Sequence, residues 1–141
     1  MDAAGTAGVI RRKIVPLFGL NRRGKMPRIL SVGYDSMLLK TRELLLKQMG
    51  YEVVSAEGFS LAYQICDSHG HTFDLVVLGH SIPHEDKVDL VKRCTETCTC
   101  PVLALLRAHE GPIKGAARSI ESGEPRVFIQ AVEDILRERH K

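Results

Sequence analysis

The sequence contains no tryptophan, and aromatic residues make up only 5% of its 141 residues. Its core must therefore consist mainly of aliphatic side chains. Long apolar runs are also absent, since none approaches the roughly 20 residues that a membrane-spanning helix requires. The apolar segment 14–20 is interrupted by Pro16 and followed at once by Arg22 and Arg23, a pattern that does not fit a signal peptide. We therefore expect a cytoplasmic protein that does not associate with membranes.

Common catalytic and nucleotide-binding motifs are missing as well. The sequence has neither a GxxxxGK(S/T) nor a GxGxxG phosphate loop, and it lacks the GxSxG and HExxH motifs. No nucleophile stands in a recognisable arrangement with a base. We therefore expect that the protein is not an enzyme.

Cysteine is scarce and unevenly placed. Three of the four cysteines lie within residues 94–100, which does not resemble the spaced framework of a disulfide-rich secreted protein. The close spacing of Cys94, Cys98 and Cys100 suggests a metal site. The second ligand pair of a zinc motif, however, is absent from the sequence. We expect buried thiols and no metal or cofactor, with redox sensitivity and metal binding as the alternatives.

Basic residues gather at the N-terminus. Residues 1–28 contain seven Lys or Arg and one acid, whereas residues 29–141 contain 13 Lys or Arg and 16 acids. We predict a basic, disordered tail over 1–26 and one domain over 27–141. Such a tail would attract nucleic acid only weakly, through its charge. The expected partner is therefore a protein.

Short apolar runs alternate with amphipathic segments from residue 28 onward. This alternation implies right-handed crossover connections and a parallel sheet with helices on both faces. We predict a doubly wound α/β fold with a flavodoxin-like five-stranded sheet of order 2-1-3-4-5, whose site lies at the carboxyl ends of the first and third strands. The expected strands are 29–33, 51–56, 74–79, 101–106 and 116–120, and the expected helices are 36–49, 59–68, 84–97 and 125–139.

Helical spacing predicts the inward face of each helix. Asp35 or Ser36 is expected to cap the first helix, and Gly50 to end it. The expected buried stripes are Leu38, Thr41, Leu45 and Met49 in 36–49, Val88, Val91 and Cys94 in 84–97, and Phe128, Ala131, Val132, Ile135 and Leu136 in 125–139.

In the order and spacing of several short segments, residues 28–139 resemble the receiver domain of response regulators, the CheY-like family of two-component signalling. The segments are RILSV at 28–32, GYEV at 50–53, FDLVVL at 73–78, IP at 82–83, PVLAL at 101–105 and EP at 124–125. The resemblance implies a phosphorelay protein that contacts a signalling kinase or regulator.

The residues needed for phosphorylation in that family are missing. It requires an acid pair that holds Mg²⁺, an acceptor Asp, a hydroxyl and a lysine, because the metal needs oxygen ligands and the phosphoryl group needs a cation. Here these positions fall on Gly33 and Tyr34 (with Asp35 one place later), Gly79, Leu106 and Glu121. We therefore expect a degenerate receiver, or pseudo-receiver, with His80 as a further contact in the cleft.

The segment after the fourth strand is shorter than in a normal receiver. Residues 107–115 contain Gly111, Pro112 and Gly115, which argue against a full helix, so the fourth helix of the family is expected to be shortened or missing. The sequence favours a domain that acts by protein contact without phosphorylation. The alternative is a sensor that binds a small ligand or nucleotide between the first and third strands.

Overall fold

Five parallel strands form one sheet in the order β3-β2-β4-β5-β6, which confirms the predicted topology. The computed structural model describes residue 20, residues 24–121 and residues 123–139. The predicted tail therefore lies mostly outside the described residues. The strands are β2 (Arg28–Gly33), β3 (Glu52–Glu57), β4 (Leu75–Leu78), β5 (Val102–Leu105) and β6 (Arg118–Ile120).

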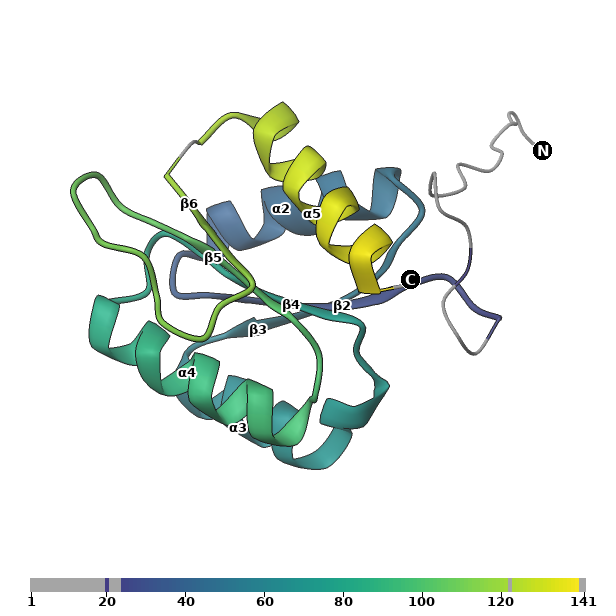
Figure 1. Ribbon diagram of the computed structural model, residues 1–141, viewed down its shortest axis with the longest axis horizontal. Helices are drawn as coiled ribbons and strands as arrows, with labels where there is room; N and C mark the ends of the chain where they lie inside the picture. The colour runs from purple at the N-terminus through teal and green to yellow at the C-terminus, as the bar shows by residue number, and fades with distance from the viewer. Residues whose placement is uncertain (1–19, 21–23, 122, 140–141) are drawn as a thin grey trace.

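Helices cover both faces of the sheet. Figure 1 shows α2 and α5 on one face and α3 and α4 on the other. The helices are α2 (Ser36–Gln48), α3 (Phe59–His69), the short 3₁₀ helix η1 (Gly70–Thr72), α4 (His84–Thr97) and α5 (Pro125–Arg139). Residues 106–117, between β5 and β6, contain no helix, so the expected loss of the family's fourth helix is confirmed. Among the described residues, no helix has the length and apolar character needed to cross a bilayer.

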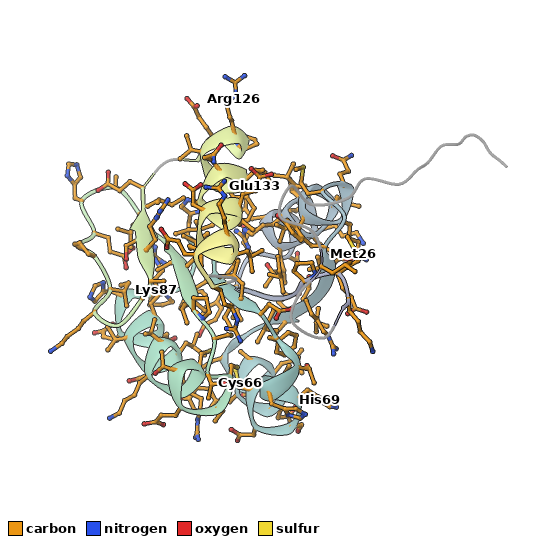
Figure 2. The ribbon with its side chains drawn as sticks, turned by 45° about the vertical axis from the view of Figure 1, so that its right-hand side comes forward. Met26, Cys66, His69, Lys87, Arg126 and Glu133 are labelled. Atoms are coloured by element: carbon orange, nitrogen blue, oxygen red, sulfur yellow. The ribbon has the colours of Figure 1, made fainter. Side chains whose placement is uncertain are left out.

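The central strand β4 separates two apolar layers. All four of its side chains are buried, as expected for a parallel strand covered on both faces. Val76 and Leu78 pack toward α3 and α4, whereas Leu75 and Val77 pack toward α2 and α5. Figure 2 shows Cys66 and Lys87 on the first side and Glu133 on the helix of the second.

Local signals set several helix boundaries as predicted. The side chain of Asp35 caps α2 by accepting hydrogen bonds from the amides of Met37 and Leu38, at 3.0 and 3.1 Å. Gly50 follows the end of α2 with φ of +91°, a left-handed conformation that glycine adopts without strain. The predicted inward stripe of α5 is buried in full.

The predicted inward face of α2 is wrong, and that of α4 is right for Val91 and Cys94 but wrong for Val88. In α2 the buried residues are Leu39, Arg42 and Leu46, whereas Leu38 is 46% exposed. The helix is turned by about one residue, or roughly 100°, from the predicted orientation. In α4, Val88 is 41% exposed while Lys87 is fully buried. In both helices the inward face therefore includes a basic residue, Arg42 in α2 and Lys87 in α4, where the apolar pattern predicted only uncharged side chains.

Candidate functional site

Two glycines face each other at the carboxyl ends of β2 and β4. Gly33 is the last residue of β2, and Gly79 directly follows β4. Both are buried, and the Gly79 amide donates a 2.9 Å hydrogen bond to the carbonyl oxygen of Val32. The structure therefore brings together the two positions at which the sequence resemblance places an acid and the phosphoacceptor of a receiver.

The guanidinium of Arg42 fills the space above these glycines. A Cβ added to Gly79 would lie 2.9 Å from Nη2 and 3.0 Å from Nη1 of Arg42, and a Cβ added to Gly33 would lie 3.5 Å from Nη1. Arg42 comes from the inward face of α2 and is only 8% exposed. A buried cation therefore occupies the space that a side chain at position 79 would need.

This guanidinium is held in an environment that does not favour charge. Burial lowers the pKa of Arg42, and the nearby carboxylate of Asp35 partly opposes that effect. Its Nη1 atom is buried and has no hydrogen-bond partner among the described residues. Because arginine is not deprotonated in proteins, the positive charge persists at this site.

The other predicted pocket positions do not supply metal ligands. Tyr34 turns to α4, where its hydroxyl donates a 2.8 Å hydrogen bond to Oδ2 of Asp86, and its amide donates to Oγ of Ser81 at 3.0 Å. Burial, followed by the hydrogen bond to Asp86 and the negative charge of that carboxylate, raises the pKa of Tyr34. Asp35 is engaged as the cap of α2. The described side chains at this edge therefore do not fit Mg²⁺, which needs an open cluster of oxygen ligands.

The remaining two predicted positions lie apart from the guanidinium. Leu106 is buried, and its amide donates a 2.7 Å hydrogen bond to the carbonyl of Ile120. Glu121 is exposed after β6. Neither position offers the hydroxyl or the cation that would bind a phosphoryl oxygen.

A small open pocket adjoins Arg42 on the α2 and α5 side of this edge. It encloses about 110 Å³, which is similar to cavities that accept a small molecule such as benzene. His80 contributes to its wall, but Gly33, Tyr34 and Gly79 do not, so this pocket is not the cleft between the first and third strands that the sequence predicts. The lining residues are Leu38, Thr41, Arg42, Leu45, His80, Leu105, Gly123, Pro125 and Phe128.

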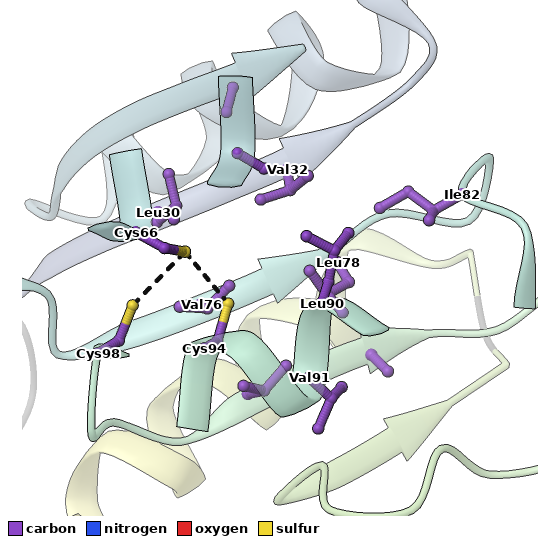
Figure 3. Packing of buried hydrophobic residues seen from close by; sticks show 14 of the residues in the cluster. Leu30, Val32, Cys66, Val76, Leu78, Ile82, Leu90, Val91, Cys94 and Cys98 are labelled. Carbon is purple, nitrogen blue, oxygen red and sulfur yellow. Dashed lines mark hydrogen bonds between the residues drawn. The ribbon is translucent and has the colours of Figure 1, made fainter. Parts of the chain in front are cut away.

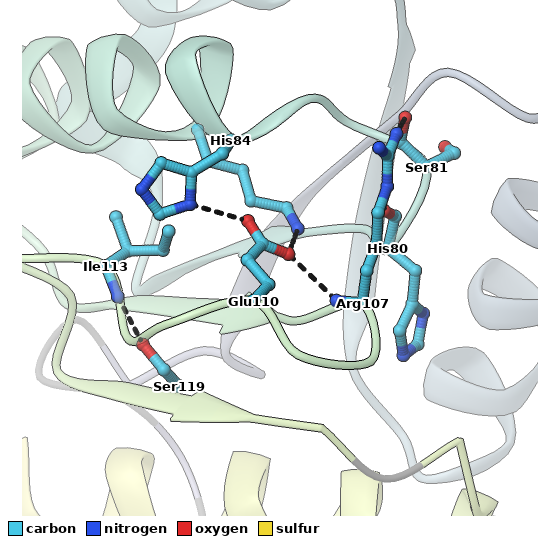
Figure 4. A network of polar contacts seen from close by, with 8 residues as sticks. His80, Ser81, His84, Arg107, Glu110, Ile113 and Ser119 are labelled. Atoms are coloured by element: carbon cyan, nitrogen blue, oxygen red, sulfur yellow. Dashed lines mark hydrogen bonds and ion pairs between the residues drawn. The ribbon is translucent and has the colours of Figure 1, made fainter.

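A polar network fixes the loop that replaces the missing helix (Figure 4). Oε1 of Glu110 accepts hydrogen bonds from Nζ of Lys87 at 2.6 Å and from the amide of Arg107 at 2.8 Å. Oε2 of Glu110 lies 2.9 Å from Nδ1 of His84. Burial alone would raise the pKa of Glu110, but these three donors outweigh it and lower that pKa to about 2. The loop is thus joined to α4 through a buried ion pair.

Arg107 joins the same loop to the site. Its Nε donates to the carbonyl of His80 at 3.0 Å, and its Nη2 donates to the carbonyl of Ser81 at 2.7 Å. Sequence patterns do not distinguish Lys87, Glu110 or Arg107 from other single charged residues, which are usually solvated. The one signal in the sequence that could have indicated this network is Lys87, a lysine at an inward position of its helix.

Comparisons with known proteins agree on the architecture. No protein-family model and no curated protein matches the sequence. Three solved structures illustrate the similarity. The first is a CheY-like response regulator receiver domain protein from Methanospirillum hungatei JF-1, with a TM-score of 0.70 and 18% identity over 82% of this chain and 97% of that one. The second is the non-phosphorylated HemR receiver domain from Leptospira biflexa, with a TM-score of 0.66 and 29% identity over 78% of this chain and 94% of that one. The third is the response regulator TrrA from Thermotoga maritima in complex with Mg²⁺-BeF, with a TM-score of 0.67 and 20% identity over 78% of this chain and 99% of that one.

Proposed function

We propose that this chain, which has the fold of a response-regulator receiver domain, transmits a signal by protein contact and without phosphorylation. The observation that carries the proposal is the position of Arg42. Its guanidinium lies against Gly79, at the point where a receiver would present the acceptor carboxylate. Glycine has no atom that could carry a phosphoryl group.

The electrostatics of the site support the same proposal. TrrA of Thermotoga maritima was solved with Mg²⁺ and BeF, whereas the corresponding edge here holds a buried positive charge. A fixed guanidinium repels a divalent cation, and burial strengthens that repulsion because the local dielectric is low. Gly33 and Tyr34 stand in place of the acid pair that would offset the repulsion, and the nearby carboxylate of Asp35 is engaged as the cap of α2.

The surface offers three regions for a protein partner. The exposed side of α2 presents Met37, Leu38 and Leu44, which are 77%, 46% and 53% exposed. The loop of residues 106–117 replaces a helix that in receivers forms part of the contact surface. The third region is the exposed side of α5, where Val127 is 38% exposed. We propose that the partner is a signalling kinase or regulator that reads one of these surfaces.

Treatment with a small-molecule phosphodonor and Mg²⁺ tests the absence of phosphorylation. We expect the mass of the intact protein to stay unchanged, while a receiver with its acid pair and acceptor gains one phosphoryl group under the same conditions. A stable gain of one phosphoryl group on this chain would contradict the proposal. Peptide mapping would then show whether His80 had accepted it.

The pocket beside Arg42 favours a second candidate, a sensor of a small ligand. Its volume of about 110 Å³ suits a compact molecule better than a whole nucleotide, and Arg42 in its wall favours an anionic one. Thermal-shift measurements with small carboxylates, inorganic phosphate and nucleotides would test this candidate. If none raises the melting temperature, or if Leu45→Trp, which fills the pocket, leaves the shift unchanged, the sensor hypothesis fails.

A further inference from the structure

All four cysteines of the chain gather on the α3 and α4 side of the sheet. Cys66 lies in α3, Cys94 in α4, and Cys98 and Cys100 lie between α4 and β5. None is more than 5% exposed. Figure 3 shows the sulfurs of Cys66, Cys94 and Cys98 directed toward one another within the apolar cluster.

The sulfur positions match those of thiolates around one metal ion. The Sγ of Cys66 lies 3.4 Å from that of Cys94 and 3.7 Å from that of Cys98, and all three atoms lie within 4.8 Å of one another. Tetrahedral zinc with Zn–S bonds of about 2.3 Å places its sulfurs about 3.8 Å apart. A disulfide requires an S–S distance of about 2.05 Å, so the three sulfurs are not paired as disulfides.

The spacing of about one helical turn brings two of the three ligands together. Cys94 and Cys98 are four residues apart, so they lie on one face at the end of α4. Cys66 faces them from α3, and it is separated from Cys94 by 28 residues in the sequence. The packing of α3 on α4 therefore supplies the ligand that the sequence motif lacked.

The residues around Cys98 accommodate its buried sulfur. Oγ1 of Thr97 lies 3.8 Å from the same sulfur, as an outer-shell group would. Gly70 makes room for it, since a Cβ there would lie 3.0 Å from Sγ of Cys98.

We propose that Cys66, Cys94 and Cys98 bind one thiophilic metal ion, Zn²⁺ in the first instance, that joins α3 to α4. Thiolates select soft and borderline ions such as Zn²⁺ and Cu(I) over Mg²⁺ or Ca²⁺. Binding releases the thiol protons and leaves a complex of three thiolates with Zn²⁺ that carries one negative charge. Cys100 is also buried, but it is not among the three sulfurs that lie within 4.8 Å of one another. The site is separate from Arg42 and from the proposed signalling function.

Metal titration of the full chain, reduced and stripped with a chelator, tests the proposal without any substitution. We expect one equivalent of Zn²⁺ to bind in competition with a chromophoric chelator, and one equivalent of Co²⁺ to give the intense absorption of tetrahedral thiolate coordination. Metal loading is also expected to raise the melting temperature. A parallel titration with Cu(I) identifies the preferred ion. Less than one equivalent of every ion, with no change in melting temperature, would overturn the proposal.

Single substitutions then test the ligand set. Cys66→Ala and Cys94→Ala should each abolish stoichiometric binding, whereas Cys100→Ala should retain the bound ion. Loss of binding in Cys100→Ala as well would contradict the proposed set of three ligands. Retention of full affinity in Cys66→Ala would overturn it. Because a variant could unfold, circular dichroism of each metal-free protein accompanies the titrations.

Discussion

Arg42 and Gly79 are complementary in shape: the guanidinium occupies the volume that any side chain at position 79 would need, with only 2.9 Å between Nη2 and an added Cβ. Neither residue explains the site alone. The arginine reaches the edge of the sheet because α2 turns it inward, and it can remain there because residue 79 has no side chain. The predictions below start from this pair.

Gly79→Ala should destabilise the protein by about 1–2 kcal/mol, because the added methyl group displaces a buried guanidinium. The cost should largely disappear in an Arg42→Ala background, which makes the two substitutions non-additive. Urea unfolding of the two single variants and the double variant measures the coupling. Gly111→Ala is the matched control, since an added Cβ there meets nothing within 4 Å and the backbone is not left-handed. Purely additive effects would show that the two residues do not share this space.

Lys87→Met should cost about 3 kcal/mol, because it leaves the Glu110 carboxylate without its buried ionic partner. Lys87 is fully buried, and its Nζ lies 2.6 Å from Oε1 of Glu110. Lys92→Met, at an exposed position of the same helix, should change stability by less than about 0.5 kcal/mol. Equal effects of the two substitutions in chemical denaturation would refute a structural role for the ion pair.

The interaction of Glu110 predicts a loss of stability in acid. Its folded-state pKa is about 2 against 4.5 for the free side chain, so its contribution is complete above about pH 4.5 and declines as the pH falls toward 2. Glu110→Gln removes this titration. The difference in unfolding free energy between wild type and Glu110→Gln should therefore narrow between pH 5 and pH 2.5, as followed by urea titrations. A difference that stays constant over this interval would show that Glu110 titrates normally in the folded protein.

Asp35→Ala should destabilise the protein by about 1 kcal/mol through loss of the cap of α2. Asp35→Asn keeps a capping oxygen but removes the negative charge that opposes the lowered pKa of Arg42. Comparing the two variants by thermal unfolding separates capping from charge. If Asp35→Asn is as damaging as Asp35→Ala, the charge on Arg42, and not the cap, accounts for the effect.

The sequence predicts the framework of the fold well, because its elements carry unambiguous local signals. In α5, Pro125 opens the helix and the apolar residues recur at helical spacing, and the observed bounds equal the predicted ones. The apolar run of β4 likewise identifies a central strand. Gly111, Pro112 and Gly115 indicate the absence of a helix between β5 and β6, and Gly115 adopts φ of +92°.

The candidate site is less predictable, because its side chains contradict the binary pattern. Arg42 and Lys87 occupy inward positions, while leucine and valine residues of the same helices face solvent. Only tertiary contacts make such burial possible: two glycines from separate strands accommodate Arg42, and a glutamate from a distant loop neutralises Lys87. The clustering of Cys66 with Cys94 and Cys98 has the same origin, since it depends on how α3 packs on α4.

A guanidinium encoded in the chain is present in every copy of the protein from the moment it folds. A covalent mark, by contrast, is added and removed, so it can record a past event and expire with time. If the domain works without phosphorylation, as proposed, it keeps no such record. On the function proposed here, the information it passes on must lie in how many copies exist and in whether a partner is bound to them.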